Sequence, residues 1–251
     1  MEPSNIPWYL NWPFWTLAVA AITTILSQIP PIRVLVKKSK IELDLYSKIA
    51  ITHKVGNPNL QLHLIISNTG GRKIKVKDMT VIIERNSKGL VKLPAQNYLQ
   101  NQADQNAVLF TKFSLNPGEE WAHITNFLNF LEREQEGEYV KYEMELAKDY
   151  QGKREELGED HNELIMLDPS VVKPFNDIFE NCFIWKAGEY TMIVNVITDH
   201  ASANVTKKYR FTIFESHEKQ LKIITDYFKF GGGIWWNPPI QTNVILELKE
   251  I

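Results

Sequence analysis

The feature that most constrains this chain is an uncharged stretch near its N-terminus. No charged side chain occurs between Pro3 and Ile32. Pro13 suits the first turn of a helix, where its missing N–H costs nothing, and Pro30-Pro31 ends one. A helix from Pro13 to Ile29 is about 25 Å long at 1.5 Å per residue, near the lower limit for crossing a bilayer. We therefore predict a transmembrane helix within residues 13–32.

The two flanks of this stretch differ in chemistry and predict its orientation. Aromatic rings that favour the headgroup region gather on the N-terminal side, at Trp8, Tyr9, Trp12 and Trp15. Cations follow on the other side, at Arg33, Lys37, Lys38 and Lys40. Positively charged flanks stay in the cytoplasm. We expect a single-pass protein of the cell membrane, with residues 1–12 extracytoplasmic, 33–40 a basic juxtamembrane linker and 41–251 cytoplasmic.

Two other interpretations of the same stretch remain open. A cleaved signal peptide would carry a positively charged N-terminus, which is missing here, and Pro-Pro before a basic run is a poor cleavage site. A buried core helix of a soluble protein would seldom carry four early Trp and Tyr residues beside a run of cations.

The remainder of the chain has the composition of a folded body. Of the 251 residues 44% are hydrophobic and 23% charged, and the residues after the anchor suffice for one large domain or two small ones. A net charge of -2 argues against binding nucleic acid through bulk charge. Cys182 is the one cysteine, so an intramolecular disulfide is excluded and a reducing compartment is favoured.

Residues 41–85 show the period of two that is typical of half-buried strands. Apolar residues alternate with polar ones over 41–55 and again over 60–66, separated by a turn at 56–59. Asn68-Thr69-Gly70-Gly71 is a strong hairpin signal. In the next strand the apolar residues change from even to odd positions at Lys77-Asp78, which predicts a β-bulge. These residues predict an antiparallel meander.

The later segments alternate between strands and short helices. We predict a loop at 94–107, strands at 109–115, 140–146, 190–198, 207–215 and 244–248, and helices at 125–134 and 168–181 and from Ser216 to the glycines at 231–233. Residues 147–163 predict a charged, exposed insertion. The expected fold is mainly β: an antiparallel β-sandwich with two or three short helices over 41–251.

One motif resembles the tyrosine corner of immunoglobulin-like domains. Gly188 and Tyr190 lie at the start of a strand that is apolar on both faces. The resemblance implies an immunoglobulin-like or related sandwich, but without its disulfide. Met192 stands where the second cysteine would be, and the earlier partner strand offers Leu62 and Leu64.

No motif in the sequence predicts catalysis or a cofactor. The six histidines form no His-x-x-x-His pair, no Gly-x-Ser-x-Gly occurs, and the acidic run at 158–163 lacks the register of a calcium loop. His53 shares the parity of an apolar strand face, so a buried, hydrogen-bonded histidine is favoured over a ligand or base. We expect no enzyme, no metal and no cofactor.

Two features favour a binding role. Residues 33–92 hold 13 Lys and Arg against 4 Asp and Glu, whereas residues 119–163 hold 5 against 14. The basic part would face the anionic inner leaflet, unless the charges segregate by accident.

Trp235 and Trp236 are adjacent, so in an extended chain one is exposed to a membrane or partner. Packing of both rings between two sheets is the alternative.

These observations favour a membrane-anchored scaffold whose partners are the bilayer and another protein, with no nucleic acid. The alternative is a sensor that binds a small anionic ligand, a nucleotide or lipid headgroup, through four clustered cations. These are Arg72, Lys73, Lys75 and Lys77. A solvated strand edge would explain the same cluster.

Overall fold

The first helix is short. The computed structural model describes residues 12–28, 38–101, 106–158 and 163–251, and begins with α1 (Trp12–Gln28), which has 17 residues. Among these described residues no helix is both long and apolar enough to cross a membrane. The predicted span 13–32 is therefore not shown. Trp8, Tyr9, Arg33 and Lys37 lie outside the described residues.

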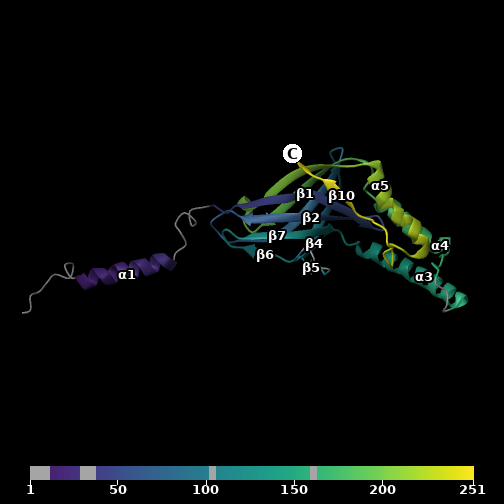
Figure 1. The fold of residues 1–251 in the computed structure, drawn as a ribbon, viewed down its shortest axis with the longest axis horizontal. Helices are drawn as coiled ribbons and strands as arrows, with labels where there is room; N and C mark the ends of the chain where they lie inside the picture. The colour runs from purple at the N-terminus through teal and green to yellow at the C-terminus, as the bar shows by residue number, and fades with distance from the viewer. Residues whose placement is uncertain (1–11, 29–37, 102–105, 159–162) are drawn as a thin grey trace, which may run out of the picture.

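The body is built on one antiparallel sheet that is nearly closed into a barrel (Figure 1). Its order is β10-β1-β2-β7-β4-β3-β8-β9-β11, with β5 beside β4 and β6 beside β3. The strands are β1 (Ile41–Lys54), β2 (Asn57–Asn68), β3 (Ile74–Arg85), β4 (Lys88–Leu99), β5 (Val108–Leu109), β6 (Phe113–Leu115), β7 (Glu120–Leu128), β8 (Gly188–Thr198), β9 (Val205–Ile213), β10 (Val244–Glu247) and β11 (Lys249–Glu250). The predicted mainly β, antiparallel fold is confirmed. The predicted sandwich is not, because the strands form a near-barrel.

The strand β4 joins the two groups of strands, β10-β1-β2-β7 and β3-β8-β9-β11, into one sheet. Its first half pairs with β3, ending at Thr80 opposite Pro94, and its second half pairs with β7, starting at Ala95 opposite Phe127. Pro94 has no N–H to donate, so it suits the point where the strand changes partner. A single strand thereby joins both halves of the barrel.

The opposite seam of the barrel is closed by the C-terminal segment. Residues 244–247 pair with β1, and residues 249–250 pair with β9. The Lys207 ammonium lies 3.5 Å from the Asp44 carboxylate and 3.0 Å from that of Glu250, so one cation on β9 links β1 and β11. This seam depends on short strands and side chains rather than on a shared strand.

The predicted turn between β1 and β2 is confirmed, but the predicted hairpin at Asn68-Thr69-Gly70-Gly71 is wrong. The turn there leads from β2, which lies between β1 and β7, to β3, which lies between β4 and β8, so the predicted meander holds only for β1 and β2. β1 and β2 pair from Ile41 opposite Asn68 to Lys54 opposite Asn57. The predicted bulge is confirmed, because the register of β3 against β8 shifts between Val76 and Asp78. Inward-facing aliphatic side chains fill the barrel. Leu62, Leu64 and Met192, which occupy the positions where an immunoglobulin-like domain would have its cysteines, are at most 1% exposed.

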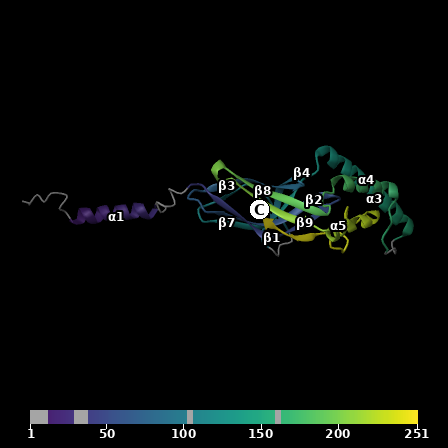
Figure 2. The ribbon, with the colours of Figure 1, turned by 90° about the horizontal axis from the view of Figure 1, so that it is seen from above.

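The helices gather at one end of the barrel, which we call the helical end (Figures 1 and 2). They are α3 (Arg133–Leu157), α4 (Pro169–Cys182) and α5 (Glu215–Lys222), which continues as the 3-10 helix η3 (Ile223–Phe230); a short 3-10 helix, η2 (Ala201–Ala203), lies elsewhere. β1 begins at the opposite end.

Four further local predictions are wrong. The predicted strand 140–146 and most of the exposed insertion 147–163 form α3, a helix of 25 residues. Its inward side chains, Tyr139, Tyr142, Leu146 and Tyr150, recur every three or four positions, as a helix requires. The predicted helix 125–134 is the end of β7, with Thr125 and Phe127 buried. The predicted loop 94–107 begins as β4, which continues to Leu99.

Two helices were predicted correctly from their ends. Asp168 caps α4 by accepting a hydrogen bond from the Ser170 amide at 2.8 Å, and Pro169 occupies the first turn. The helix continues past Pro174 to Cys182. α5 starts at Glu215, one residue before the predicted cap, and η3 ends where Gly231 adopts a left-handed φ of 76°.

Tyr190 makes the hydrogen bonds that are typical of a tyrosine corner. Its hydroxyl lies 2.7 Å from the Lys186 carbonyl oxygen and 2.8 Å from that of Ile184, both a few residues upstream. The nearly closed sheet does not support an immunoglobulin-like fold, however. The contact is thus shared with that family while the strand arrangement is not.

Candidate functional site: the two ends of the barrel

The end of the barrel where β1 begins carries exposed cations, and we call it the basic end. Its six cations are Lys38, Lys40, Arg72, Lys73, Lys75 and Lys77. The turn after β2 is fastened to the residues before β1, since the Gly70 and Gly71 amides donate to the carbonyls of Lys40 and Lys38 at 3.0 and 3.4 Å. Gly70 is required here, because a Cβ atom would lie 2.6 Å from the Lys38 carbonyl oxygen.

Asn68 fixes the shape of that turn from inside. Its side chain is buried; the amide nitrogen donates to the carbonyls of Arg72 and Leu115, and the amide oxygen accepts from Gly70. Because every polar atom of this side chain is used, the backbone of the turn is held in place. Arg72 and Lys73 therefore project from a well-ordered support.

Carboxylates lie among these cations and keep part of the charge balanced. The pKa of Asp199 is lowered by the hydrogen bond from the Lys75 amide at 2.9 Å, with Lys77 contributing. The pKa of Glu119 is lowered by hydrogen bonds from Asn116, with a contribution from Lys73. The six cations are all exposed and form an open surface. The structure thus brings the predicted anionic-ligand residues together, but on a face rather than in a pocket.

At the helical end, Trp235 and Trp236 lie in a tight turn after η3. Trp235 is 36% exposed, and its ring meets the edge of Tyr150 with centroids 5.7 Å apart. Trp236 is half-buried and donates its indole N–H to the Phe230 carbonyl at 3.0 Å. The two rings differ in exposure, as their adjacency predicted. A contact with a partner or membrane stays a prediction.

A cavity of about 390 Å³ lies beside these tryptophans. We call it the aromatic groove, and it is lined by Tyr150, Leu164, Ile165, Phe230, Trp235 and Trp236, with Glu163 at its edge. The structure therefore joins two regions that the sequence marked separately, the charged insertion and the tryptophan pair. Tyr150 was missed as part of the site because its helix was not predicted.

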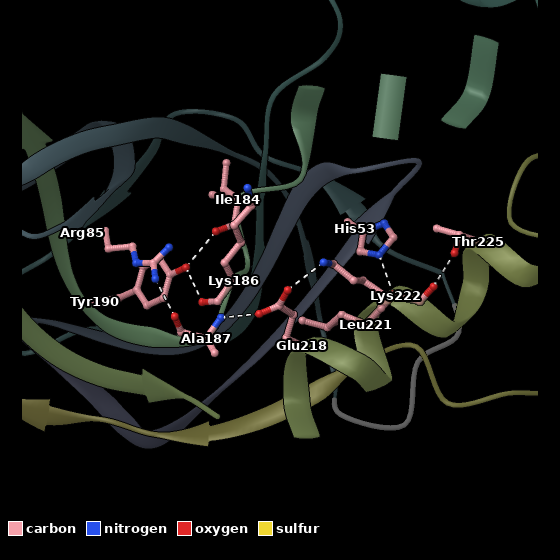
Figure 3. Close-up of polar contacts among 10 residues, drawn as sticks. All are labelled: His53, Arg85, Ile184, Lys186, Ala187, Tyr190, Glu218, Leu221, Lys222 and Thr225. Carbon is pink, nitrogen blue, oxygen red and sulfur yellow. Dashed lines mark hydrogen bonds and ion pairs between the residues drawn. The ribbon is translucent and has the colours of Figure 1, made fainter. Parts of the chain in front are cut away.

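His53 links the barrel to the helices above the groove (Figure 3). Its Nδ1 accepts from the Gly56 amide at 3.1 Å, so the proton sits on Nε2, which donates to the Leu221 carbonyl at 2.9 Å. Its ring also meets the edges of Phe179 and Phe183. Burial lowers the pKa of His53, which keeps the ring neutral. The expected hydrogen bonding of this histidine is confirmed, while its side chain is half-buried rather than fully buried.

A second polar network joins α5 to the start of β8 (Figure 3). Glu218 binds Lys222 at 2.7 Å and accepts from the Ala187 amide at 2.7 Å, and these two partners lower its pKa. Arg85 donates to the Ala187 carbonyl and lies over the Tyr190 ring. The charged groups of this network are engaged with one another and with the backbone, so its role is to hold the helical end in place.

Neither a metal-binding cluster nor an activated thiol is found among the described residues. Among them no group of three or more His, Cys, Asp or Glu side chains could hold a metal ion. Burial raises the pKa of the Cys182 thiol, which makes it a poor nucleophile near neutral pH. The acidic run at 158–163 falls partly outside the described residues.

Comparison with models of known protein families and with curated proteins gives no match for this chain. The function is therefore inferred from the surfaces of this protein alone. The most distinctive are the apolar helix α1, the basic end and the aromatic groove.

Proposed function

We propose that this protein is a membrane-attached, non-enzymatic scaffold. In this proposal α1 inserts into the bilayer with the N-terminus outside, the basic end rests on the anionic cytoplasmic leaflet, and the aromatic groove binds another protein. The observation that carries the proposal is that the exposed cations and the aromatic groove lie at opposite ends of one barrel. The cations flank the starts of β1 and β3, and the groove lies beside η3 at the end where α3, α4 and α5 gather (Figure 1).

The surface of α1 supports attachment to lipid. Large apolar side chains are exposed around it, among them Trp12 at 81% and Leu17 at 72%. Its hydroxyl groups bond to carbonyls of the preceding turn, as Thr24 does to Ala20 and Ser27 does to Thr24. Those polar groups need no water, which suits an apolar surrounding.

The basic end supports an orientation toward anionic lipid. Each Lys or Arg near a membrane surface contributes about 1 kcal/mol. Lys40 is paired with Glu42 at 2.5 Å, so the attraction to lipid comes mainly from the other five cations. The chain reaches β1 through Lys38 and Lys40, so this end is also the one nearest to α1 in sequence. Attachment and electrostatics therefore act on the same end of the barrel.

Vesicle flotation of the full-length protein tests the membrane part. We expect flotation with phosphatidylserine vesicles to exceed that with neutral phosphatidylcholine vesicles, and each Lys→Ala change at Lys73 or Lys75 to weaken binding about fivefold. Lys141→Ala and Lys148→Ala at the helical end are matched controls and should change little. A protein that stays soluble without detergent and floats with neither vesicle would contradict the proposal.

Crosslinking in cells tests the partner part. Trp235→Ala should lose a crosslinked partner that the native protein captures, because it removes the exposed ring of the aromatic groove. Phe214→Ala is a suitable control, since Phe214 is 57% exposed and lies outside the groove. Equal capture by both variants would remove the groove from the proposal.

The alternative function, a sensor for a small anionic ligand, uses four of the same cations. It predicts that ATP or an inositol phosphate raises the melting temperature of the full-length protein, and that Arg72→Ala abolishes the shift. Binding to a soluble anion without binding to anionic vesicles would favour the sensor over the scaffold.

A further inference from the structure

A second cavity at the helical end lies away from the aromatic groove, between α3 and the barrel. Its volume is about 460 Å³, within the range of small-molecule sites. The β1–β2 hairpin, the end of β7 and the first turns of α3 form its walls, with Ile178 of α4. More than half of its lining residues are apolar or aromatic, among them Val55, Leu128, Phe130, Leu131, Val140 and Ile178.

Two polar atoms in this lining have no hydrogen-bond partner. The Tyr139 hydroxyl and the amide oxygen of Asn59 are both buried and have no hydrogen-bond partner. The Tyr139 side chain as a whole is only 8% exposed. Buried polar groups almost always have partners, and an unpaired one costs free energy. The neighbouring Asn57 is different, because its amide nitrogen donates to the Asn129 carbonyl at 2.9 Å. The unpaired atoms therefore distinguish this cavity chemically.

The Tyr139 ring is held rigidly and its hydroxyl remains a donor. The ring meets the edge of Phe175 with centroids 5.4 Å apart, and the Lys54 ammonium lies 5.6 Å from its centre. Burial and the nearby Glu143 raise the pKa of Tyr139 to about 12, so the hydroxyl keeps its proton at neutral pH. Lys54 is exposed on a flexible stem and is the part of the cavity that can move aside.

The charges around the cavity do not favour an ion of either sign. Lys54 faces Glu136 and Glu143, and the remaining lining residues are uncharged. Phe130 is 72% exposed and Val140 46% exposed, so apolar surface extends to the opening. A neutral ligand with an apolar body matches this lining better than a charged one.

We propose that this cavity binds a small uncharged molecule that has an apolar body and one amide or hydroxyl group. Both polar atoms are shielded from solvent in the free protein, so Lys54 moves aside when the ligand enters. An amide carbonyl then accepts a hydrogen bond from the Tyr139 hydroxyl, and the amide N–H donates to the Asn59 oxygen. The apolar body lies against Phe130, Val140 and Ile178. The site is independent of the membrane and partner surfaces proposed above.

Titration of the full-length protein with benzamide, followed by protein-observed NMR, tests this site. We expect saturable binding with shifts at Val140 and Ile178, and at least fivefold weaker binding of benzoate, which is charged and lacks the N–H donor. Tyr139→Phe should weaken benzamide binding about 3- to 10-fold, the effect of one hydrogen bond. Tyr209→Phe is the matched control, because the Tyr209 hydroxyl is also buried and unpaired but lies outside this cavity.

A blocking variant keeps the test decisive if Tyr139→Phe fails to fold. Val140→Trp places a large ring over the opening from an exposed helix position and should abolish benzamide binding with little change in melting temperature. The inference is overturned if native protein shows no saturable shift. It is also overturned if either folded variant binds benzamide as tightly as native protein does.

Discussion

The two ends of this barrel are closed in different ways. At the basic end, tight turns and strand ends are joined by backbone hydrogen bonds and by the buried side chain of Asn68, and cations cover the outside. At the helical end, α4 and η3 pack aromatic side chains against the hairpin, as where Phe179 stacks on Phe183 and meets His53. Rings also pack inside the basic end, where Trp121 contacts Tyr98 and Phe113, so the two ends differ in the cations outside one and the helices that cover the other. Surface changes at the basic end should therefore cost little stability, whereas changes at the helical end should cost much.

The largest difference between the ends is expected for aromatic truncation. Phe179→Ala removes a ring that is 3% exposed and contacts His53, Phe183 and Phe228, so we expect a loss of about 3–5 kcal/mol of unfolding free energy. Phe113→Ala at the basic end removes a half-buried ring and should cost clearly less. Urea denaturation measures both. Equal losses would show that packing is not concentrated at the helical end.

A smaller effect is expected at the junction between α4 and β8. Tyr190→Phe leaves the carbonyls of Ile184 and Lys186 without this donor, and should cost about 1–3 kcal/mol while the fold is retained. The Tyr46→Phe change, at a tyrosine of β1 that is 56% exposed, is the comparison variant. Thermal and urea unfolding report the loss, and an unchanged midpoint would argue against the observed contact.

The two ends should also respond differently to acid through His53. Its pKa is lowered in the folded protein, so below the unfolded value of 6.5 the unfolded chain binds protons more readily. The stability contributed by neutral His53 is complete above about pH 6.5 and is lost as the pH falls through the folded pKa. His53→Gln should flatten this part of the profile. A native profile identical to that of the variant between pH 7 and 5 would contradict this.

The smallest effect is expected for the exposed cations. Lys75→Ala should change unfolding free energy by less than about 0.5 kcal/mol, because its side chain is exposed and only its backbone bonds to Asp199. The same variant should weaken vesicle binding, which would separate membrane attraction from stability. A large loss of unfolding free energy would mean that the Lys75 side chain also stabilises the fold.

Local signals predicted the elements whose ends carry distinct turn or cap chemistry. The Asp168-Pro169 pair marked a helix start that the structure confirms. The glycines after Asn68 marked a turn, but the strands on its two sides do not pair as the predicted hairpin. The parity switch at Lys77-Asp78 located a bulge. These features depend on the backbone conformations of a few neighbouring residues, which is why they can be inferred without the fold.

The missed elements depend on distant contacts. In α3, Val140, Tyr142, Met144 and Leu146 alternate like a strand, but Val140 and Met144 are exposed. The spacing of Tyr139, Tyr142, Leu146 and Tyr150 was the signal that would have predicted a helix. The amide-rich second half of β4 forms a strand only because β7 lies beside it.

The candidate sites likewise divide into those that local sequence predicts and those that depend on distant contacts. The cations and the tryptophan pair were visible as clusters in the sequence. Tyr150 and the Tyr139 cavity were not, since both depend on where α3 packs against other elements.

The seam at β10 has a consequence for how the protein is made. The ribosome delivers β1 early, yet the residues that close its outer edge come much later, as the contact between Thr52 and Thr242, 190 residues apart, illustrates. At about 5–20 residues per second that delay is on the order of 10 to 40 s. Throughout it, the growing chain presents a free strand edge to any neighbouring polypeptide. Correct closure of the barrel requires that this edge be shielded until residues 244–247 emerge.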